Sequence, residues 1–466
     1  MKVAVIGLDC AAPQLVFDRF REDLPNLCRL MDGGVWGRLR SCDPPITVPA
    51  WSCMMSGFDP GQLGIYGFRN RKDYSYGGYK IADGSAIGVD RAWDVLSAAG
   101  KRVMLLGVPQ TYPVRPVHGC VVSDFLTPST ESEYTFPPEL KADVERASGG
   151  YVFDVDNFRT SDKSALLERI YVKTKKHFAV ARRLLESQRW DFFMMVEMGT
   201  DRIHHAFWSY MDSTHPRYEP ANAFEGVIRE YYRYVDRQVG ELVAILPLDT
   251  VVLVVSDHGA KRLEGGICFN EWLIREGYLT LKKYPTCPTP IESVEIDWLR
   301  TTAWGDGGYY GRVFLNVRGR EPHGIVARED YEEVRDGLVE QIARITDSHG
   351  RNIGSRAYRP EELYRNVNGI APDLIVYFGD LDWRSIGSVG YSSIYSFEND
   401  TGPDEANHDW EGIFIMQGPR IVPQRSHYSI YDVGPTILNL FDLEGTPGGV
   451  GRSMPLVASS PLAKAR

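Results

Sequence analysis

The feature of this sequence that most constrains the fold is a series of short apolar runs, each the length of a β-strand. Runs this short and this continuously apolar predict strands that are buried on both faces. They are 2-KVAVIGL-8, 102-RVMLLGV-108, 191-DFFMMVEM-198, 251-VVLVVS-256, 373-DLIVYF-378 and 412-GIFIMQG-418. Between the runs, residues 163–188, 222–246 and 327–346 have apolar residues at the spacing that is typical of helices.

Strands that alternate with helices predict an α/β fold with a largely parallel central sheet and helices on both faces. Residues 1–261 and 406–466 are predicted to form the core, with an elaboration at 109–162 that is rich in Pro, Ser, Thr and Tyr. Residues 262–405 include Gly-rich aromatic patches such as 304-WGDGGYYGR-312. We expect them to form an inserted, cap-like region that contributes to substrate specificity.

The composition argues against several classes of function. Of 466 residues, 52 are basic and 62 are acidic, and the formal net charge of −10 disfavours a nucleic-acid or anionic-membrane surface. No apolar run approaches the roughly 18 residues of a transmembrane helix, and the apolar part of MKVAVIGLD is too short for a signal sequence. The seven cysteines include no CxxC pair and are expected to be reduced thiols. These features predict a soluble cytoplasmic protein.

Aspartate and histidine side chains gather in the loops beside four of the predicted strands. They are Asp9, Asp201, His205, Asp257, His258 and His408. Taken alone, Asp9 has the position of a turn or cap residue, and Asp201 and His205, four residues apart, could share a solvated helix face. Because the carboxyl ends of parallel strands meet at one edge of a sheet, the whole set can share a site. Imidazole and carboxylate groups without thiolates suit a divalent metal ion of hard to borderline character.

One further stretch, 44-PPITVPAWSCMMSG-57, places Thr47 near the predicted start of a short helix. A hydroxyl in that position often does no more than cap the helix. A threonine hydroxyl is a poor nucleophile at neutral pH, and no histidine lies near Thr47 in the sequence to act as its base. Thr47 is therefore either a cap or a nucleophile that a bound metal ion activates.

The order of these residues resembles that of the alkaline phosphatase superfamily, and most of all its type I phosphodiesterase/nucleotide pyrophosphatase branch. The stretch 47-TVPAW-51 is similar to the nucleophile loop of that branch, and 256-SDHG-259 is similar to its metal loop. The segment 430-IYDVGPTIL-438 looks like the closing helix of the family. The resemblance covers residues 3 to about 440, and it implies an alkaline phosphatase-like three-layer sandwich.

Carried over residue by residue, the resemblance implies a centre of two divalent metal ions, with zinc expected and manganese as the alternative. The ligands implied for the first ion are Asp201, His205 and His408. Those implied for the second ion are Asp9, Asp257, His258 and the oxygen of Thr47. The implied reaction is hydrolysis of a phosphodiester or pyrophosphate bond in a small-molecule substrate, through a phosphothreonine intermediate at Thr47.

Two positions depart from the family pattern. Ala50 stands where an asparagine that contacts the phosphate is usual, and Leu63-Gly64 stands where His-Gly is usual. These departures concern the nucleotide pyrophosphatase assignment and leave the phosphohydrolase assignment intact.

Several basic and aromatic residues near the motif loops are candidates for binding the substrate. The candidates are Arg69, Arg71, Lys261, Arg262, Trp51 and Trp304. The arginines and the lysine could hold a phosphate or the leaving group, and the tryptophans could stack on a base or sugar. Ordinary surface charge and core packing are the competing interpretations.

Two other functions remain open at the level of the sequence. The first is a different reaction of the same superfamily: hydrolysis of a phosphonate, sulfate or phosphomonoester, or transfer of the phosphoryl group to an acceptor other than water. Sulfatases of the superfamily generally use a modified cysteine, so Thr47 counts against them. The second is a metal-stabilised binding protein on an enzyme fold, against which the seven intact motif positions argue.

Overall fold

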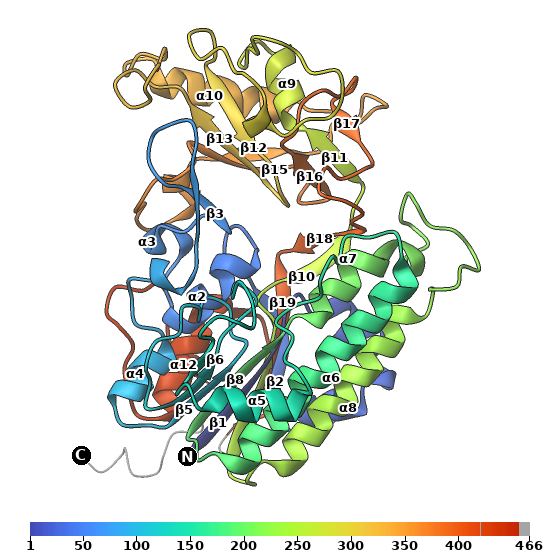
Figure 1. Cartoon of the computed structure of the whole chain (residues 1–466), viewed down its shortest axis with the longest axis vertical. Coiled ribbons are helices and arrows are strands. Elements are labelled where there is room, and N and C mark those ends of the chain that lie inside the picture. Colours follow the sequence, from blue (N-terminus) through green and yellow to red (C-terminus); the bar gives the residue numbers. More distant parts are fainter. Residues whose placement is uncertain (420, 456–466) are drawn as a thin grey trace.

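The computed structural model describes residues 1–419 and 421–455 (Figure 1). Its largest element is a ten-stranded sheet with the order β20-β2-β19-β9-β1-β8-β5-β6-β7, in which β21 also pairs with β2. The strands are β1 (Lys2–Leu8), β2 (Val35–Arg40), β5 (Val103–Leu106), β6 (Gly119–Val122), β7 (Thr135–Phe136), β8 (Phe192–Glu197), β9 (Thr250–Val255), β19 (Glu411–Gln417), β20 (Gln424–Arg425) and β21 (Tyr428–Ser429). The central strands β9, β1, β8, β5 and β6 are parallel, as the sequence predicts.

The outer strands make the sheet mixed rather than parallel throughout. β19 is antiparallel to both β9 and β2, and β7 is antiparallel to β6. After β9 the chain continues as β10 (Gly259–Arg262), and it returns much later as β18 (Ala406–Asp409), which pairs antiparallel with β10. Because β19 follows β18 directly, it enters the sheet from the carboxyl edge of β9 and runs against it.

Most of the predicted strands and helices are confirmed, but two segments lie elsewhere in the fold than the sequence predicts. The run 373–378 forms β15 (Leu374–Tyr377), which lies outside the central sheet. The segment 109–162, expected as an elaboration, contributes β6 and β7 to the sheet itself. The predicted core range 406–466 extends to residues that lie outside the described part of the chain. The predicted helices are α6 (Lys163–Ser187), α8 (Val227–Ile245) and α10 (Tyr331–Ile342).

Helices cover both faces of the sheet and give a three-layer sandwich (Figure 1). Side chains of β1 alternate between the two cores: Ala4 and Ile6 enter one, and Val3 and Val5 enter the other. This alternation follows from the two-residue period of a strand and explains why the run is apolar throughout. The helices of the first face are α1 (Pro25–Asp32), α5 (Leu140–Ser148), α6, α7 (Gly199–Met211) and α8. Those of the second face are α2 (Thr47–Ser56), α4 (Ala92–Ala98) and α12 (Val433–Leu440).

Between β10 and β18 the chain forms a second, smaller assembly beyond the carboxyl edge of the central sheet (Figure 1). It has its own apolar core, which includes Phe269, Leu315 and Leu338. Its four-stranded sheet contains β12 (Ala303–Asp306), β13 (Gly311–Leu315), β15 and β14 (Arg356–Tyr358). A three-stranded sheet contains β16 (Trp383–Ile386), β11 (Gly265–Cys268) and β17 (Tyr395–Ser396), and the helices are α9 (Phe269–Arg275) and α10.

Short elements of the first hundred residues reach toward this assembly. They are α3 (Pro60–Leu63), β3 (Arg69–Arg71) and β4 (Tyr79–Ile81). Across the described residues, no helix has the length and apolar character needed to cross a membrane.

Candidate active site

Four segments bring the predicted metal ligands together at the carboxyl edge of the central sheet. Asp9 follows β1, and Asp257 and His258 follow β9. Helix α7, which begins just after β8, and strand β18 supply the remaining three ligands. Because β8, β1 and β9 are adjacent parallel strands, their ends lie side by side. All six ligands and Thr47 are buried.

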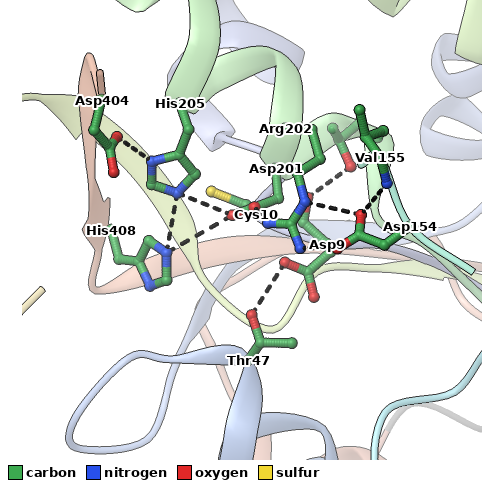
Figure 2. A network of polar contacts seen from close by, with 12 residues as sticks. Asp9, Cys10, Thr47, Asp154, Val155, Asp201, Arg202, His205, Asp404 and His408 are labelled. Carbon is green, nitrogen blue, oxygen red and sulfur yellow. Dashed lines mark hydrogen bonds and ion pairs between the residues drawn. The ribbon is translucent and has the colours of Figure 1, made fainter. Parts of the chain in front are cut away.

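The first group contains Asp201, His205 and His408 (Figure 2). The Oδ1 atom of Asp201 lies 3.1 Å from Nε2 of His205 and 3.7 Å from Nε2 of His408. The two histidine Nε2 atoms are 3.2 Å apart. Asp201 and His205 are four residues apart on α7, and that spacing puts both side chains on one face of the helix.

The second group contains Asp9, Asp257 and His258. Nε2 of His258 lies 3.2 Å from Oδ2 of Asp257 and 3.8 Å from Oδ1 of Asp9. The Thr47 hydroxyl lies 3.4 Å from Oδ1 of Asp9 and 3.3 Å from Nε2 of His258. The two groups adjoin, because the ring of His258 stacks on that of His408 at 3.8 Å between centroids.

Backbone and carboxylate oxygens fix the ring orientation of all three histidines. Nδ1 of His205 lies 2.7 Å from Oδ1 of Asp404, Nδ1 of His258 lies 3.1 Å from the Gly259 carbonyl, and Nδ1 of His408 lies 2.8 Å from the Pro45 carbonyl. A ring that donates from Nδ1 presents the lone pair of Nε2 on its other side. The three Nε2 lone pairs therefore point into the site.

This arrangement fits divalent cations. Two nitrogens 3.2 Å apart need a cation near both, either a proton on one ring or a metal ion that both rings coordinate. Within the described residues, the buried Oδ2 of Asp257 accepts no hydrogen bond, which is costly unless a cation coordinates it. Imidazole and carboxylate together are ligands that Zn²⁺ and Mn²⁺ both accept.

The second group is electrostatically unsatisfied. Burial, with the like charge of Asp257, raises the pKa of Asp9 well above its usual value. Burial also raises the pKa of Asp257 well above its usual value and lowers the pKa of the His258 imidazole. Without a cation, the protein disfavours the ionised state of both carboxyls.

The first group is compensated by neighbouring side chains. Burial raises the pKa of Asp201, but the charges of His205 and Arg202 outweigh burial and hold it well below its usual value. Burial lowers the pKa of His205, but Asp404 outweighs that effect and raises it well above its usual value. The Arg202 guanidinium donates to both Asp201 and Asp154 (Figure 2).

Asp404, Arg202 and Asp154 were not among the residues predicted from the sequence. Asp404 stands four residues before His408 in the same acidic run, so an acid beside a ligand histidine was the available signal. Arg202 and Asp154 have no comparable signal, because they meet only after α7 packs against the segment before α6.

Thr47 is not a helix cap. The N-cap of α2 is Ile46, and no side chain caps this helix end. Val48 has the non-helical angles φ −109° and ψ 110°, so regular helix begins only after it. The extended conformation of Ile46 and Val48 lets the Thr47 hydroxyl face Asp9 and His258. Thr47 therefore does not act as a cap, and its hydroxyl is directed toward the candidate ligands instead.

The sequence model described as type I phosphodiesterase/nucleotide pyrophosphatase matches residues 3–404. The chain belongs to this family. The resemblance inferred from the order of Asp9, Thr47, Asp201, His205, Asp257 and His258 is thereby confirmed; His408 lies just beyond the matched range.

Solved structures show the fold of this family. Human ectonucleotide pyrophosphatase/phosphodiesterase 5 aligns with a TM-score of 0.57 and 12% identity, over 98% of this chain and 100% of that chain. Phosphonoacetate hydrolase from Sinorhizobium meliloti 1021, in complex with phosphonoformate, aligns with a TM-score of 0.61 and 15% identity, over 93% of this chain and 94% of that chain. At such identities the likeness establishes the alkaline phosphatase-like fold alone.

An inactive variant of the murine phosphodiesterase 5, with threonine replaced by alanine and in complex with AMP, aligns with a TM-score of 0.56 and 14% identity, over 96% of both chains. GPI ethanolamine phosphate transferase 2 of Candida glabrata is 22% identical over 264 residues, 56% of this chain. That alignment spans 26% of the transferase, so this chain matches only about a quarter of the transferase's length.

Trp51, predicted as a possible stacking residue for substrate, has a different role. Its side chain is fully buried, with 0% exposure, and its Nε1 donates a 2.7 Å hydrogen bond to Oδ2 of Asp9. A buried indole cannot stack on a ligand, so this prediction is wrong. Trp51 instead fixes the carboxylate of Asp9. Trp304 is also buried, in the core of the smaller assembly.

The predicted basic residues separate into two sets. Lys261 lies 2.9 Å from Oδ1 of Asp382 and donates to the Asp380 carbonyl, so it ties β10 to the smaller assembly rather than facing the site. Arg71 pairs with the buried Glu321, and Arg262 pairs with Glu264. Of these four basic residues, only Arg69 lines a cavity between the central sandwich and the smaller assembly.

A cavity of about 440 Å³ lies between the central sandwich and the smaller assembly. Ile46, next to Thr47, lines it, as does Tyr309 of the Gly-rich patch. The Tyr309 ring stacks on His408 at 4.0 Å and on His205 at 5.0 Å between centroids. Tyr309 therefore connects the wall of the cavity to the two histidines of the first group.

Proposed function

We propose that this chain hydrolyses a phosphodiester or pyrophosphate bond in a small-molecule substrate, with Thr47 as the nucleophile and two divalent cations as cofactors. The observation that carries the proposal is the position of the Thr47 hydroxyl, 3.4 Å from Asp9 and 3.3 Å from His258 inside a set of six metal-type ligands. A hydroxyl that served only structure would have no reason to enter such a set.

The residues divide into two sites. The first cation would be held by Asp201, His205 and His408. The second would be held by Asp9, Asp257 and His258, beside Thr47. Two divalent cations supply Lewis acidity and positive charge for phosphoryl transfer when they are bound. Zinc suits three imidazoles best, and manganese is the alternative that carboxylate-rich sites also accept.

The reaction would proceed in two displacements at phosphorus. In the first, a bond forms between Thr47 Oγ1 and phosphorus while the bond to the leaving oxygen breaks, and the hydroxyl proton passes through solvent to the leaving oxygen. In the second, a water oxygen bonds to phosphorus while the bond to Thr47 Oγ1 breaks; one water proton passes to Thr47 Oγ1 and the other stays on the phosphoryl product. Splitting the transfer in this way replaces one difficult step with two easier ones.

Neighbouring side chains hold the reacting groups in place. The Trp51 indole fixes Asp9, and the Asp404 carboxylate fixes the ring of His205. The burial of these groups keeps water away from all but the open side of the site, where charge interactions are consequently stronger.

The comparisons support this proposal through proteins of the same fold. A threonine-to-alanine variant of the murine phosphodiesterase 5 is described as inactive and was obtained with AMP. By analogy, a single threonine and a phosphoric ester are the expected nucleophile and ligand here.

The decisive experiment is Thr47→Ala, assayed with bis-p-nitrophenyl phosphate after loading with zinc or manganese. We expect turnover to disappear while about two equivalents of metal remain, because Thr47 supplies only one of the ligand atoms. Thr250→Ala is the matched control, since Thr250 is also a buried threonine but begins β9 at the opposite edge. Full activity of Thr47→Ala would end the covalent mechanism.

Transfer to an acceptor other than water is the second candidate, favoured by the similarity to an ethanolamine phosphate transferase. The phosphothreonine would then pass its phosphoryl group to an alcohol. Adding an alcohol acceptor to the assay would raise p-nitrophenol release and yield an alkyl phosphate. Comparing the rates of hydrolysis of phosphate, phosphonate and sulfate probes would test the phosphonate and sulfate alternatives.

A further inference from the structure

The cavity beside the site lies on the side where a leaving group must depart. Thr47 contacts ligands of the second group, Asp9 and His258, whereas the Tyr309 wall of the cavity stacks on ligands of the first group. In phosphoryl transfer the attacking and leaving oxygens are roughly in line. A leaving group that departs away from Thr47 therefore leaves on the side of the first group, which the Tyr309 wall of this cavity adjoins.

Two arginines of the cavity wall share one carboxylate. Nε of Arg159 lies 3.3 Å from Oδ2 of Asp404, and Nη1 of Arg384 lies 2.9 Å from the same oxygen. The other carboxylate oxygen accepts from His205. One carboxylate group thus pairs with two guanidinium groups.

Arg384 is the more informative of the two arginines. Its side chain lines the cavity, the residue is 4% exposed, and its Nε has no hydrogen-bond partner among the described residues. A buried N–H of a charged group without an acceptor is costly. Arg159 is also anchored, because its Nη2 donates to the Tyr309 hydroxyl at 2.9 Å. The pair is therefore a preformed anion site.

Among the described residues, the acids that line the cavity form no ion pair with Arg159 or Arg384, whose carboxylate partner is Asp404. Asp306 pairs with Arg312, and Asp400 accepts hydrogen bonds from the backbone and hydroxyl of Ser388. Arg69, at the exposed side of the cavity, has no ion-pair partner within the described part of the chain. Asp400 and the exposed Glu292 therefore have no basic partner within the described residues.

We propose that the substrate has a leaving group with its own negative charge, a carboxylate or a second phosphate, which Arg159 and Arg384 bind in this cavity. The proposal rests on the proposed function, since it names the class of phosphoric ester that the same site cleaves. The volume of about 440 Å³ admits a group of drug-fragment to nucleotide size.

Matched diesters of methyl phosphate test the charge preference. The leaving groups are 4-carboxyphenol, its methyl ester, 4-(phosphonomethyl)phenol and 4-(trimethylammoniomethyl)phenol. The methyl ester has the more reactive leaving group, so intrinsic reactivity works against the expected result. We expect kcat/KM for the carboxylate or phosphonate probe to exceed that of the neutral ester by about tenfold or more, and the larger of the two identifies the anion.

Arg384→Gln and Arg159→Gln test the residues. Each removes a charge but keeps hydrogen-bonding groups, and each should bring the ratio of anionic to neutral kcat/KM close to one. The ratio is the readout, because both arginines also contact Asp404 and can change turnover of every probe. Arg262→Gln is the control: it removes a positive charge from β10 outside the cavity and should leave the ratio as in the wild type.

A binding measurement separates failure of this inference from failure of the proposed function. Calorimetry with the Thr47→Ala protein compares 4-hydroxybenzoate with its methyl ester, without any turnover. Tighter binding of the carboxylate, lost in Arg384→Gln, supports the anion site even if no probe is hydrolysed. Equal turnover and equal binding of all probes, or a preference for the cationic probe, would overturn it while leaving the hydrolase intact.

Discussion

The two ligand groups at the carboxyl edge of the sheet are similar in composition but differ in how the protein balances their charge. Around Asp201 and His205, the neighbours Arg202 and Asp404 supply opposite charges at hydrogen-bond distance. Around Asp9 and Asp257 there is no such cation among the described residues, and Trp51 offers only a neutral donor. Neighbouring side chains therefore balance the charge of the first group, whereas among the described residues the second group has no charged partner of its own.

This difference separates two ways of building a metal centre. Side chains that are already paired hold their geometry when the metal leaves. Carboxylates that lie close together without a cationic partner repel each other, and a bound dication removes that repulsion. In the proposed reaction the second group adjoins the nucleophile Thr47, so the excess negative charge lies where a cation is most needed.

Loss of a ligand from either group should have the largest effect. Asp201→Asn and Asp257→Asn are each expected to lower turnover of a diester probe by about 10³-fold or more, because both cations act on one phosphoryl group. Elemental analysis should show about one equivalent of metal lost in each variant. Asp249→Asn, an exposed acid at the opposite edge of the sheet, is the control. Unchanged metal content in both variants would contradict the two-site arrangement.

Glu197 offers a third buried carboxylate for comparison, one that needs no cation. Burial raises its pKa, but the charge of Lys173 and a hydrogen bond with His177 outweigh burial and hold it at about 2. A carboxyl group whose pKa is lower in the folded than in the unfolded state stabilises the fold at pH values above its unfolded pKa. That contribution is lost as the pH falls toward 2. Glu197→Gln should therefore cost roughly 2–4 kcal/mol of unfolding free energy at pH 7.

The pH dependence of that cost is the check. Chemical denaturation of wild type and Glu197→Gln should show a difference that is constant near neutrality and shrinks between about pH 4.5 and pH 2. A difference that persisted at pH 2 would mean that packing, rather than charge, is what the substitution removes.

Asp404→Asn tests the first ligand group, whose charges are paired with neighbouring side chains. The amide can still accept from His205, but it no longer compensates the charge of Arg159 and Arg384. We expect a loss of about 10- to 100-fold in metal affinity or turnover, the usual effect of losing a partner of a ligand histidine. Metal titration of the variant measures it, and wild-type affinity would show that Asp404 is dispensable.

The smallest effect concerns stability without metal, where the two groups should respond in opposite directions. In chelator-treated protein, Asp257→Asn should stabilise the fold by about 1–2 kcal/mol because it removes an unpaired buried charge. Asp201→Asn should destabilise by about 1–2 kcal/mol because Arg202 and His205 lose a partner. Thermal melts after chelation measure both, and shifts of the same sign would erase the distinction between the groups.

The sequence predicted features that depend on neighbouring residues better than features that depend on contacts between distant segments. β1 has the bounds predicted from the run 2–8, since continuous apolar residues leave few alternatives. β2 was missed because its sequence VWGRLR alternates apolar and basic residues and lacks the signature of a buried strand. The candidate ligands were predictable because they lie close to strand ends: Asp9, Asp257 and His258 follow β1 and β9, and Asp201 and His205 lie on the helix that follows β8.

The substrate-binding predictions were less successful for the same reason. Lys261 and Arg69 look alike in the sequence, as basic residues soon after a motif. Only the packed structure pairs Lys261 with Asp382 and leaves Arg69 at the cavity. Likewise, nothing local shows that Trp51 donates to Asp9 across more than forty residues.

The sequence alone determined the α/β class, the family and the identity of the seven residues at the centre, because strand-end positions and motif order are local properties of the chain. Tertiary structure alone decided which histidine nitrogens face inward, which carboxylates are paired, and that Arg159, Arg384 and Asp404 meet beside the site. Those three come from segments far apart in the chain. Their charge balance arises only when the smaller assembly packs over the edge of the sheet, since Coulomb interactions depend on distance in space and not on position in the sequence.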